Sequence, residues 1–234
     1  MYRGHLIATL VGILLLAGCA TIRGSGNIKT ESRSVSGFTA VDLSGSGHLT
    51  IEQTGTESLT IEAEDNILPL LTSDVSNGTL RLGVKDNTNV LTTKTINYRL
   101  TVRDLNNLIV SGSGEATAAS ITAGKFTITL SGSGEVTAAS ITASQFTVIL
   151  SGSGKVTLGG TADSQAITIS GSGHYDAAKL ASKSAIIDIS GSGTAVVMPS
   201  DTLDATIGGS GSVEYIGNPT VNQNITGLGS ISKR

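Results

Sequence analysis

The chain has 234 residues and a formal net charge of −3; 38% of its residues are hydrophobic, 14% charged and 3% aromatic. This hydrophobic content argues against intrinsic disorder. The net charge is slightly negative, whereas nucleic-acid-binding proteins usually carry a strongly basic surface. Glycine, serine and threonine are abundant, which disfavours helices. The composition therefore predicts an all-β protein with a real core and no nucleic-acid partner.

Residues 1–18 have the features of a secretory signal peptide. Arg3 supplies a positive charge, an apolar run extends from Leu6 to Leu16, and small residues follow. The alternative is an uncleaved transmembrane anchor, for which the apolar run is short. The segment Leu16-Ala17-Gly18-Cys19 resembles the lipobox of bacterial lipoproteins. That resemblance implies cleavage before Cys19 and acylation of its thiol and amino group.

Cys19 is therefore the candidate lipid attachment site. It is also the single cysteine of the chain, so no intramolecular disulfide can form. Several acyl chains would make membrane anchoring stable, whereas one chain alone binds marginally. Ala20 rather than aspartate follows the cysteine, which by analogy with enterobacterial lipoproteins implies transfer to the outer membrane. We expect a lipid-anchored protein of the bacterial cell envelope, on the periplasmic or the surface face.

The rest of the chain divides by its pattern. Residues 19–36 are expected to form a lipidated tether, and residues 37–234 a single β domain. Within that domain, residues 37–104 lack a regular period, whereas residues 105–234 are repetitive. We treat the first part as an irregular half of the same domain, with a separate domain as the alternative.

Residues 37–104 nevertheless carry clear strand and turn signals. Residues 58–63 and 97–102 alternate apolar and polar side chains, as half-buried strands do. Asn77-Gly78 lies between two apolar segments and is the strongest β-hairpin signal in the chain. Residues 66–71 contain a proline and are expected to form a loop or a short helical turn.

The second half is organised by a Ser-Gly-Ser-Gly motif. The motif or a degenerate copy begins at Ser44, Ser111, Ser131, Ser151, Ser170, Ser190, Gly208 and Thr226. From Ser111 onward the steps are 20, 20, 19, 20, 18 and 18 residues. A nearly fixed period of this length is typical of stacked repeat architectures.

When the repeats are aligned, apolar and polar columns alternate on both sides of the motif. The apolar column before it is Val110, Leu130, Leu150, Ile169, Ile189, Ile207 and Ile225. The first apolar column after it is Ala116, Val136, Val156, Tyr175, Ala195, Val213 and Ile231. The polar column between them is Glu115, Glu135, Lys155, His174, Thr194 and Ser212. This period of two predicts strands with the apolar columns inside and the polar columns outside.

A repeat of about 20 residues at strand rise must bend more than once. One bend is the Ser-Gly-Ser-Gly motif, and a second is expected near Ala123-Gly124, Ala143-Ser144 and their equivalents, where a surface loop could absorb length differences. We predict a right-handed, parallel, β-helix-like solenoid in which each repeat is one coil. The alternative makes each repeat a hairpin in an antiparallel barrel or sandwich.

Several motifs together resemble a known family. They are Gly-Phe38-Thr-Ala-Val-Asp-Leu-Ser-Gly-Ser-Gly, the segment 61–66 that ends in Glu-Asp-Asn, Asn77-Gly-Thr-Leu80 and the serial Ser-Gly-Ser-Gly turns. In this order the chain resembles the "putative auto-transporter adhesin, head GIN domain" family over most of residues 24–234. The resemblance implies a β-helix-like fold and export, and it offers no catalytic motif.

Known site patterns fit the chain poorly. No Gly-Lys-Ser/Thr segment opens a helix as in a phosphate-binding loop. In a calcium-binding β-roll, aspartates would stand where the repeats have Ala116, Val136 and Val156. His48 and His174 both fall in the outward column, beside ordinary repeat serines. Glu115 and Glu135 would be neighbours there, as a weak cation site or, with Lys155, as a solvated face.

We therefore predict no catalytic residues, no metal ligands and no cofactor. The predicted protein is a non-catalytic, lipid-anchored envelope protein with a structural, adhesive or ligand-presenting role. Its partners would be the membrane, through the N-terminal lipid, and a glycan or an envelope protein. The alternative is a glycan-active enzyme, like β-helical polysaccharide lyases and hydrolases, which would need two convergent carboxylates.

Overall fold

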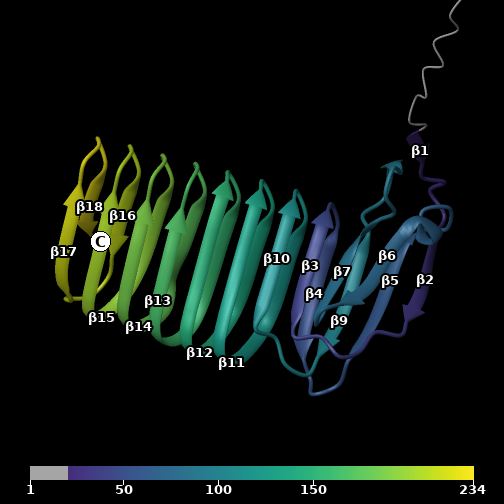
Figure 1. Cartoon of the computed structure of the whole chain (residues 1–234), viewed down its shortest axis with the longest axis horizontal. Coiled ribbons are helices and arrows are strands. Elements are labelled where there is room, and N and C mark those ends of the chain that lie inside the picture. Colours follow the sequence, from purple (N-terminus) through teal and green to yellow (C-terminus); the bar gives the residue numbers. More distant parts are fainter. Residues whose placement is uncertain (1–20) are drawn as a thin grey trace, which may run out of the picture.

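The structure, a computed structural model, describes residues 21–234. The predicted signal peptide, residues 1–18, and Cys19 lie outside the described residues. The strands (Figure 1) are β1 (Thr21–Arg23), β2 (Ile28–Arg33), β3 (Ala40–Gly45), β4 (His48–Gln53), β5 (Ser58–Glu64), β6 (Leu71–Ser76), β7 (Thr79–Val84), β8 (Asn89–Leu91), β9 (Asn97–Val102), β10 (Asn107–Gly112), β11 (Glu115–Gly132), β12 (Glu135–Gly152), β13 (Lys155–Ile169), β14 (His174–Ile189), β15 (Thr194–Ile207), β16 (Ser212–Tyr215), β17 (Thr220–Ile225) and β18 (Ser230–Lys233). A short 3-10 helix, η1 (Leu68–Leu70), precedes β6. Among residues 21–234, no helix has the length and apolar character needed to span a membrane.

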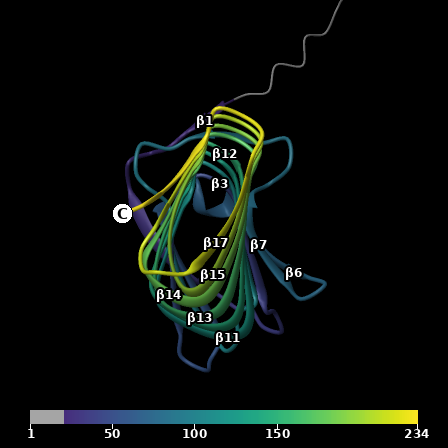
Figure 2. The same cartoon turned by 90° about the vertical axis from the view of Figure 1, so that its left-hand side faces the viewer.

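Strands β10 to β15 stack parallel to one another, so that each repeat forms one coil of a β-solenoid. Equivalent residues of consecutive repeats become neighbours: Phe126 pairs with Phe146, and Leu130 with Leu150. The coils stand side by side along the long axis (Figure 1) and wind in the right-handed sense (Figure 2). The predicted parallel solenoid is thus confirmed, and the antiparallel alternative is wrong for the repeats.

The predicted apolar columns form continuous files inside the solenoid. Val110, Leu130 and Leu150 are each at most 1% exposed. Phe126 and Phe146 stack on each other with ring centroids 5.9 Å apart. Because each file is shared by adjacent coils, a coil can bury its apolar side chains only against its neighbours.

At the Ser-Gly-Ser-Gly bend, glycines of successive coils lie directly on one another. The amide of Ser133 donates to the carbonyl of Gly112, and the amide of Ser153 to the carbonyl of Gly132, both at 2.9 Å. Gly132 has a φ of 126°, in the region that favours glycine. A Cβ atom on Gly132 would also lie 3.0 Å from both the amide nitrogen and the carbonyl carbon of Gly112. The motif therefore recurs because its backbone must approach the preceding coil closely.

The unequal repeat lengths are absorbed mainly by bulges within strands. The register shifts between Ala138 and Ile141, where β12 pairs with β13, and between Thr157 and Gly159, where β13 pairs with β14. Where β14 pairs with β15, the register also shifts between Ser182 and Ser184, at the second bend itself. Length differences are thus partly absorbed there, as expected, but without a surface loop, because β11 to β15 run through that bend as continuous strands. Gly160 lies at one bulge with a φ of 115°, since a bulge takes up an extra residue without interrupting the sheet.

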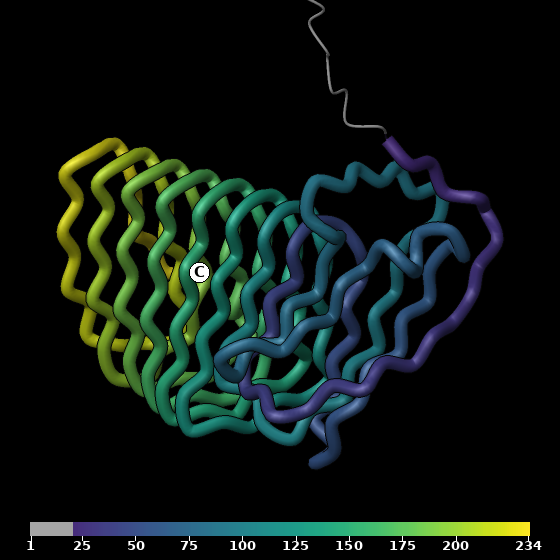
Figure 3. The backbone as a smooth tube through the Cα atoms, turned by 45° about the vertical axis from the view of Figure 1, so that its right-hand side comes forward, coloured from purple at the N-terminus to yellow at the C-terminus, as the bar shows by residue number. Residues whose placement is uncertain are grey.

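The N-terminal half continues the solenoid and then becomes irregular (Figure 3). Strands β3 and β4 pair in parallel with β10 and β11, so they form the first coil. Beyond them β5 pairs antiparallel with β2 and β9, and β6 with β7. Asn77 and Gly78, with φ of 51° and 72°, make the turn between β6 and β7. This confirms the predicted hairpin, whose favoured turn needs positive φ at both residues.

We expected a tether at residues 19–36, but the described part of this segment includes two strands. β1 pairs in parallel with β8, and β2 pairs antiparallel with β5. Five of the six residues of β2 have exposed side chains and the sixth is half-buried. An edge strand of this kind is held by main-chain hydrogen bonds, so it lacks the alternation by which a half-buried strand is recognised.

Arg33, the last residue of β2, closes the N-terminal end of the solenoid. Its guanidinium donates to the carbonyl of Leu68 at 2.8 Å and to that of Leu71 at 2.7 Å. It also forms an ion pair with Glu31 at 2.9 Å. Because β2 lies at the edge of one side of the solenoid and Leu71 begins β6 at the edge of the other, these bonds join the two edges across the end of the core.

A buried carboxylate fastens the chain just before β2. Glu64 is 1% exposed and accepts hydrogen bonds from the amide of Gly26 at 2.7 Å, the amide of Thr93 at 2.9 Å and the hydroxyl of Thr93 at 2.6 Å. These bonds, led by that from the Thr93 hydroxyl, lower the pKa of Glu64 against the opposing effect of burial. A Cβ atom on Gly24 would overlap this carboxylate. The Glu-Asp-Asn segment at residues 64–66 is thus a structural latch.

Candidate functional site

The outward polar column after the Ser-Gly-Ser-Gly bend is a ladder of paired side chains. His48 Nδ1 lies 3.2 Å from a carboxylate oxygen of Glu115, and Lys155 Nζ lies 3.4 Å from one of Glu135. Each of the two neighbouring glutamates thus has its own nitrogen partner, and the charge of Lys155 offsets the repulsion between them. His174 is hydrogen-bonded to Thr194 on the next coil, so the column forms a solvated face of local pairs.

Two aspartates of the repeats, Asp163 and Asp204, are each engaged by a polar side chain of a neighbouring coil. Asp163 forms an ion pair with Lys183 at 2.8 Å. Asp204 accepts a hydrogen bond from Asn222 at 2.7 Å, on the following coil. In the part of the chain that the structure describes, no three His, Cys, Asp or Glu side chains gather as they would around a metal ion.

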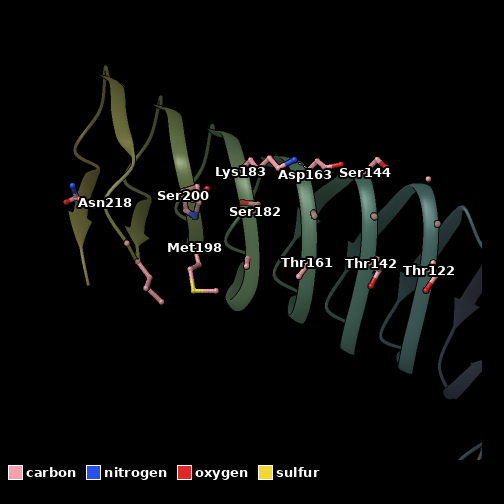
Figure 4. A pocket seen from close by; sticks show the side chains of 18 residues that line it. Thr122, Thr142, Ser144, Thr161, Asp163, Ser182, Lys183, Met198, Ser200 and Asn218 are labelled. Atoms are coloured by element: carbon pink, nitrogen blue, oxygen red, sulfur yellow. Dashed lines mark ion pairs between the residues drawn. The ribbon is translucent and has the colours of Figure 1, made fainter.

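A groove of about 900 Å³ runs along the second bend and crosses six consecutive coils (Figure 4). Each coil contributes three consecutive residues, namely 122–124, 142–144, 161–163, 181–183, 198–200 and 216–218. Strand pairing keeps the triplets of the first three coils in register with one another, so that Ala123 lies beside Ala143, and Ala143 beside Ala162. The parallel stack therefore builds one continuous surface feature from a three-residue segment of each coil.

The lining of the groove is mostly apolar and uncharged. Thr122, Thr142 and Thr161 follow one another along one side, and the alanines next to them present only methyl groups (Figure 4). Towards the C-terminal end, Met198 and Ile216 continue the lining with larger apolar side chains. One side of the lining therefore changes from threonine near the N-terminal end to methionine and isoleucine near the C-terminal end.

The opposite side of the groove carries its only charges among the described lining residues, Asp163 and Lys183. They form the ion pair at 2.8 Å, and the hydrogen bond and charge of Asp163 raise the pKa of Lys183. The carboxylate of Asp201 acts on Lys183 in the same direction. The ammonium group is therefore paired with a carboxylate of the protein itself.

One polar side chain in the groove lining connects to the interior. Ser182 is 6% exposed, and its oxygen accepts a hydrogen bond from Gln165 Nε2 at 2.7 Å. The hydroxyl of Tyr175 donates to Gln165 Oε1 at 2.8 Å across the interior. Burial raises the pKa of Tyr175, so the phenol stays a neutral donor. Tyr175 lies in the inward column, as predicted, and Gln165 of this polar trio stands at the position that Phe126 and Phe146 occupy on the two preceding coils.

Sequence reasoning located the second bend but did not recognise the groove. The available signal was the run of small residues at one aligned position, Ala123, Ala143, Ala162 and Ser182. That signal indicates a hollow only when the path of the backbone is known, because the same residues also suit a tight bend. Cys19, the predicted lipid attachment site, lies outside the described residues.

Comparison with known proteins agrees with this architecture. A "putative adhesin" from Bacteroides fragilis has a TM-score of 0.86 and 27% sequence identity, and the alignment covers 91% of this chain and 100% of that one. A "putative lipid binding protein" from Parabacteroides distasonis has a TM-score of 0.76 and 26% identity, covering 92% and 100% of the two chains. A "putative adhesin" from Parabacteroides merdae, at 21% identity and a TM-score of 0.67, covers 92% and 99% and shares the fold.

A search among curated proteins finds no match. The family model described as "putative auto-transporter adhesin, head GIN domain" matches residues 37–219, from before the first coil to the last residues of the groove. This range includes the first coil, the Glu64 latch, the hairpin at Asn77 and the stacked glycine bends. The chain therefore belongs to the putative auto-transporter adhesin, head GIN domain family.

Proposed function

We propose that this protein is a non-catalytic component of the bacterial cell envelope that is anchored through lipid on Cys19 and presents an adhesive, ligand-binding surface. Its family and two of its structural neighbours carry the description of adhesins. The leader, with its apolar run and Leu16-Ala17-Gly18-Cys19, supports export and acylation. Ala20 after the cysteine supports an outer-membrane location.

The groove along the second bend is the observation that carries the binding role. It extends over six coils, and its lining lacks the pair of convergent carboxylates that glycan hydrolysis would require. The one acid–base pair in it, Asp163 with Lys183, is already joined in an ion pair. A site of this kind holds a ligand without reacting with it.

A lipid ligand is the second element of this proposal. A neighbour at 26% identity is named a "putative lipid binding protein", and the apolar lining of the groove favours the same class of ligand here. An envelope protein that is itself lipid-anchored would meet such ligands in the membrane on which it is held.

Anchoring is tested by fractionation of cells that produce Cys19→Ala, with Ala20→Ser as the matched control. We expect the control to sediment with the outer membrane and Cys19→Ala to leave the membrane fraction. The further variant Ala20→Asp should shift the protein to the inner membrane. Membrane retention of Cys19→Ala would contradict lipid anchoring.

Adhesion is tested with the soluble form, residues 20–234, which keeps every strand that the structure describes. We expect it to bind isolated envelope vesicles, and a bulky Thr142→Trp change in the groove to reduce this binding. The matched control is Thr147→Trp, which lies on an outward face away from the groove lining. Equal binding by both variants would contradict the role of the groove.

A further inference from the structure

We propose that the groove along the second bend holds one extended acyl chain of an uncharged lipid. The inference rests on the proposed ligand-binding function and specifies the chemistry of the ligand. Four properties of the groove lead to it: its length, its lining, the state of its charges and the direction of the backbone beneath it.

The length of the groove matches that of a long acyl chain. Neighbouring parallel strands lie about 4.8 Å apart, so six coils span about 24 Å along the solenoid axis. An extended alkyl chain with C–C bonds of about 1.5 Å advances about 1.25 Å per carbon, so this span corresponds to roughly 16 to 18 carbons with margin at either end. The groove is continuous over this distance because the coils are parallel.

The lining favours alkyl groups over sugars. The alanine, methionine and isoleucine side chains along the groove offer methyl, methylene and thioether contacts, which gain from removing apolar area from water. Among the described residues that line it, none is aromatic, so it offers no ring on which a sugar could stack. Met198 is the most adaptable of these contacts because its side chain is unbranched and flexible.

The charges of the groove give an anionic headgroup no free cation to bind. Lys183 is paired with Asp163 at 2.8 Å and also lies within the influence of Asp201. A carboxylate or phosphate would have to compete with Asp163 for the ammonium group of Lys183, so the pair offers an anion little net attraction. An uncharged headgroup, such as glycerol, needs no free cation and can accept a hydrogen bond from the hydroxyl of Ser182, whose oxygen already accepts from Gln165.

The backbone under the groove disfavours a peptide. Here the strands run across the groove, and their peptide groups pair from coil to coil, as Thr122 pairs with Thr142. A peptide that follows the groove would therefore cross the strands and could not add itself to the sheet. An alkyl chain needs no such hydrogen bonds.

The experiment measures binding of 1-monopalmitoylglycerol to the soluble form, residues 20–234, by native mass spectrometry and titration. We expect one molecule per chain. Palmitate at neutral pH should bind at least about tenfold more weakly, a difference equal to about 1.4 kcal/mol. The octanoyl analogue should also bind more weakly, since each methylene group removed from a buried chain weakens binding by up to roughly fourfold, from about 0.8 kcal/mol per group.

Two alanine variants locate the site. Ala181 is exposed and lines the groove, so Ala181→Glu should reduce monopalmitoylglycerol binding by about tenfold or more, because it places a charge against the alkyl chain. Ala166 lies on an outward face and does not line the groove, so Ala166→Glu should bind as the unchanged protein does. Thermal melting of both variants checks that each is folded.

A third variant tests the charge argument. Asp163→Asn releases Lys183 from its ion pair, so palmitate should gain affinity relative to monopalmitoylglycerol. An unchanged preference would overturn the assignment of headgroup charge.

Absence of monopalmitoylglycerol binding, or binding that Ala181→Glu and Ala166→Glu affect equally, would overturn the acyl-chain proposal. Capture of a glycan or a peptide that Ala181→Glu abolishes would overturn it as well. If the soluble form still adheres to envelope vesicles in that case, the proposed adhesive function stands and the choice of ligand alone is wrong.

Discussion

Replacement of Gly132 by valine probes the contact between coils at its tightest point. The φ of Gly132 is 126°, and a Cβ atom there would lie 3.0 Å from two backbone atoms of Gly112 and closer still to its carbonyl oxygen. That oxygen accepts the hydrogen bond from Ser133. A side chain at this position must therefore either distort the bend or push the two coils apart.

The expected cost follows from these two effects. Holding a non-glycine residue at such a φ costs about 1–3 kcal/mol, and weakening one hydrogen bond between coils adds about 1 kcal/mol. Gly132→Val should therefore lower the free energy of unfolding by about 3 kcal/mol. In a domain of this size, about 2–4 °C of melting temperature is lost per kcal/mol, so the melting temperature should fall by roughly 6–12 °C.

The matched control is Gly124→Val on the same coil. No atom lies within 4 Å of a Cβ built on Gly124, and its φ lies outside the strained region. Its free energy of unfolding should change by less than about 0.5 kcal/mol, as at most surface positions. Urea denaturation of both variants is the assay. Equal stability of the two valine variants would refute the argument that close stacking of coils requires the glycine.

Two further substitutions test buried polar groups. Glu64→Gln removes the negative charge of the acceptor that the amides of Gly26 and Thr93 bind, so hydrogen exchange at these amides should speed up. Because the folded pKa of Glu64 is lowered, the carboxylate's contribution to stability is complete above the unfolded pKa of about 4.5. That contribution is lost as the pH falls through the folded pKa. Exchange at these amides that is identical in variant and parent would contradict the latch. Tyr175→Phe leaves Gln165 Oε1 without its donor and should cost about 1–3 kcal/mol, and adding Gln165→Phe, which extends the file of phenylalanines, should recover part of it. Calorimetric melting that shows no recovery would count against this account of the polar trio.

The repeats made the fold of residues 105–234 predictable. Leu130 and Leu150 stand at the same aligned position, and stacking places them next to each other in one file. The apolar positions of a single repeat therefore predict the contacts between successive coils. The hairpin at Asn77 was predictable for a local reason, since its turn type demands residues that tolerate positive φ. The contacts between coils are predictable because the repeats are nearly identical, and the hairpin is predictable because its turn depends on two adjacent residues.

Other features depend on contacts that leave no periodic trace. The side chains of β2 are exposed, so its sequence lacks a strand pattern and was interpreted as a tether. The strand is held instead by main-chain pairing with the edge of β5 and by the hydrogen bonds of Arg33. The bulges near Ala138 and Thr157 arise because neighbouring coils differ in their number of residues, which the sequence of one coil alone does not show. The groove depends on how the backbone curves at the second bend, which small residues permit but do not specify.

Parallel, in-register stacking of the coils underlies both the stacked glycines of the Ser-Gly-Ser-Gly bend and the groove along the second bend. Disulfide formation in the soluble form, which lacks Cys19, tests it most directly. Thr127 and Thr147 are register partners on adjacent coils, so their Cα atoms should lie about 4.8 Å apart, within the range that a disulfide can bridge. Thr127 and Ala166 are two coils apart, at about 10 Å, beyond that range. We predict that the Thr127→Cys/Thr147→Cys pair oxidises readily and that Thr127→Cys/Ala166→Cys stays reduced; the opposite result, or equal oxidation of both pairs, would contradict the account.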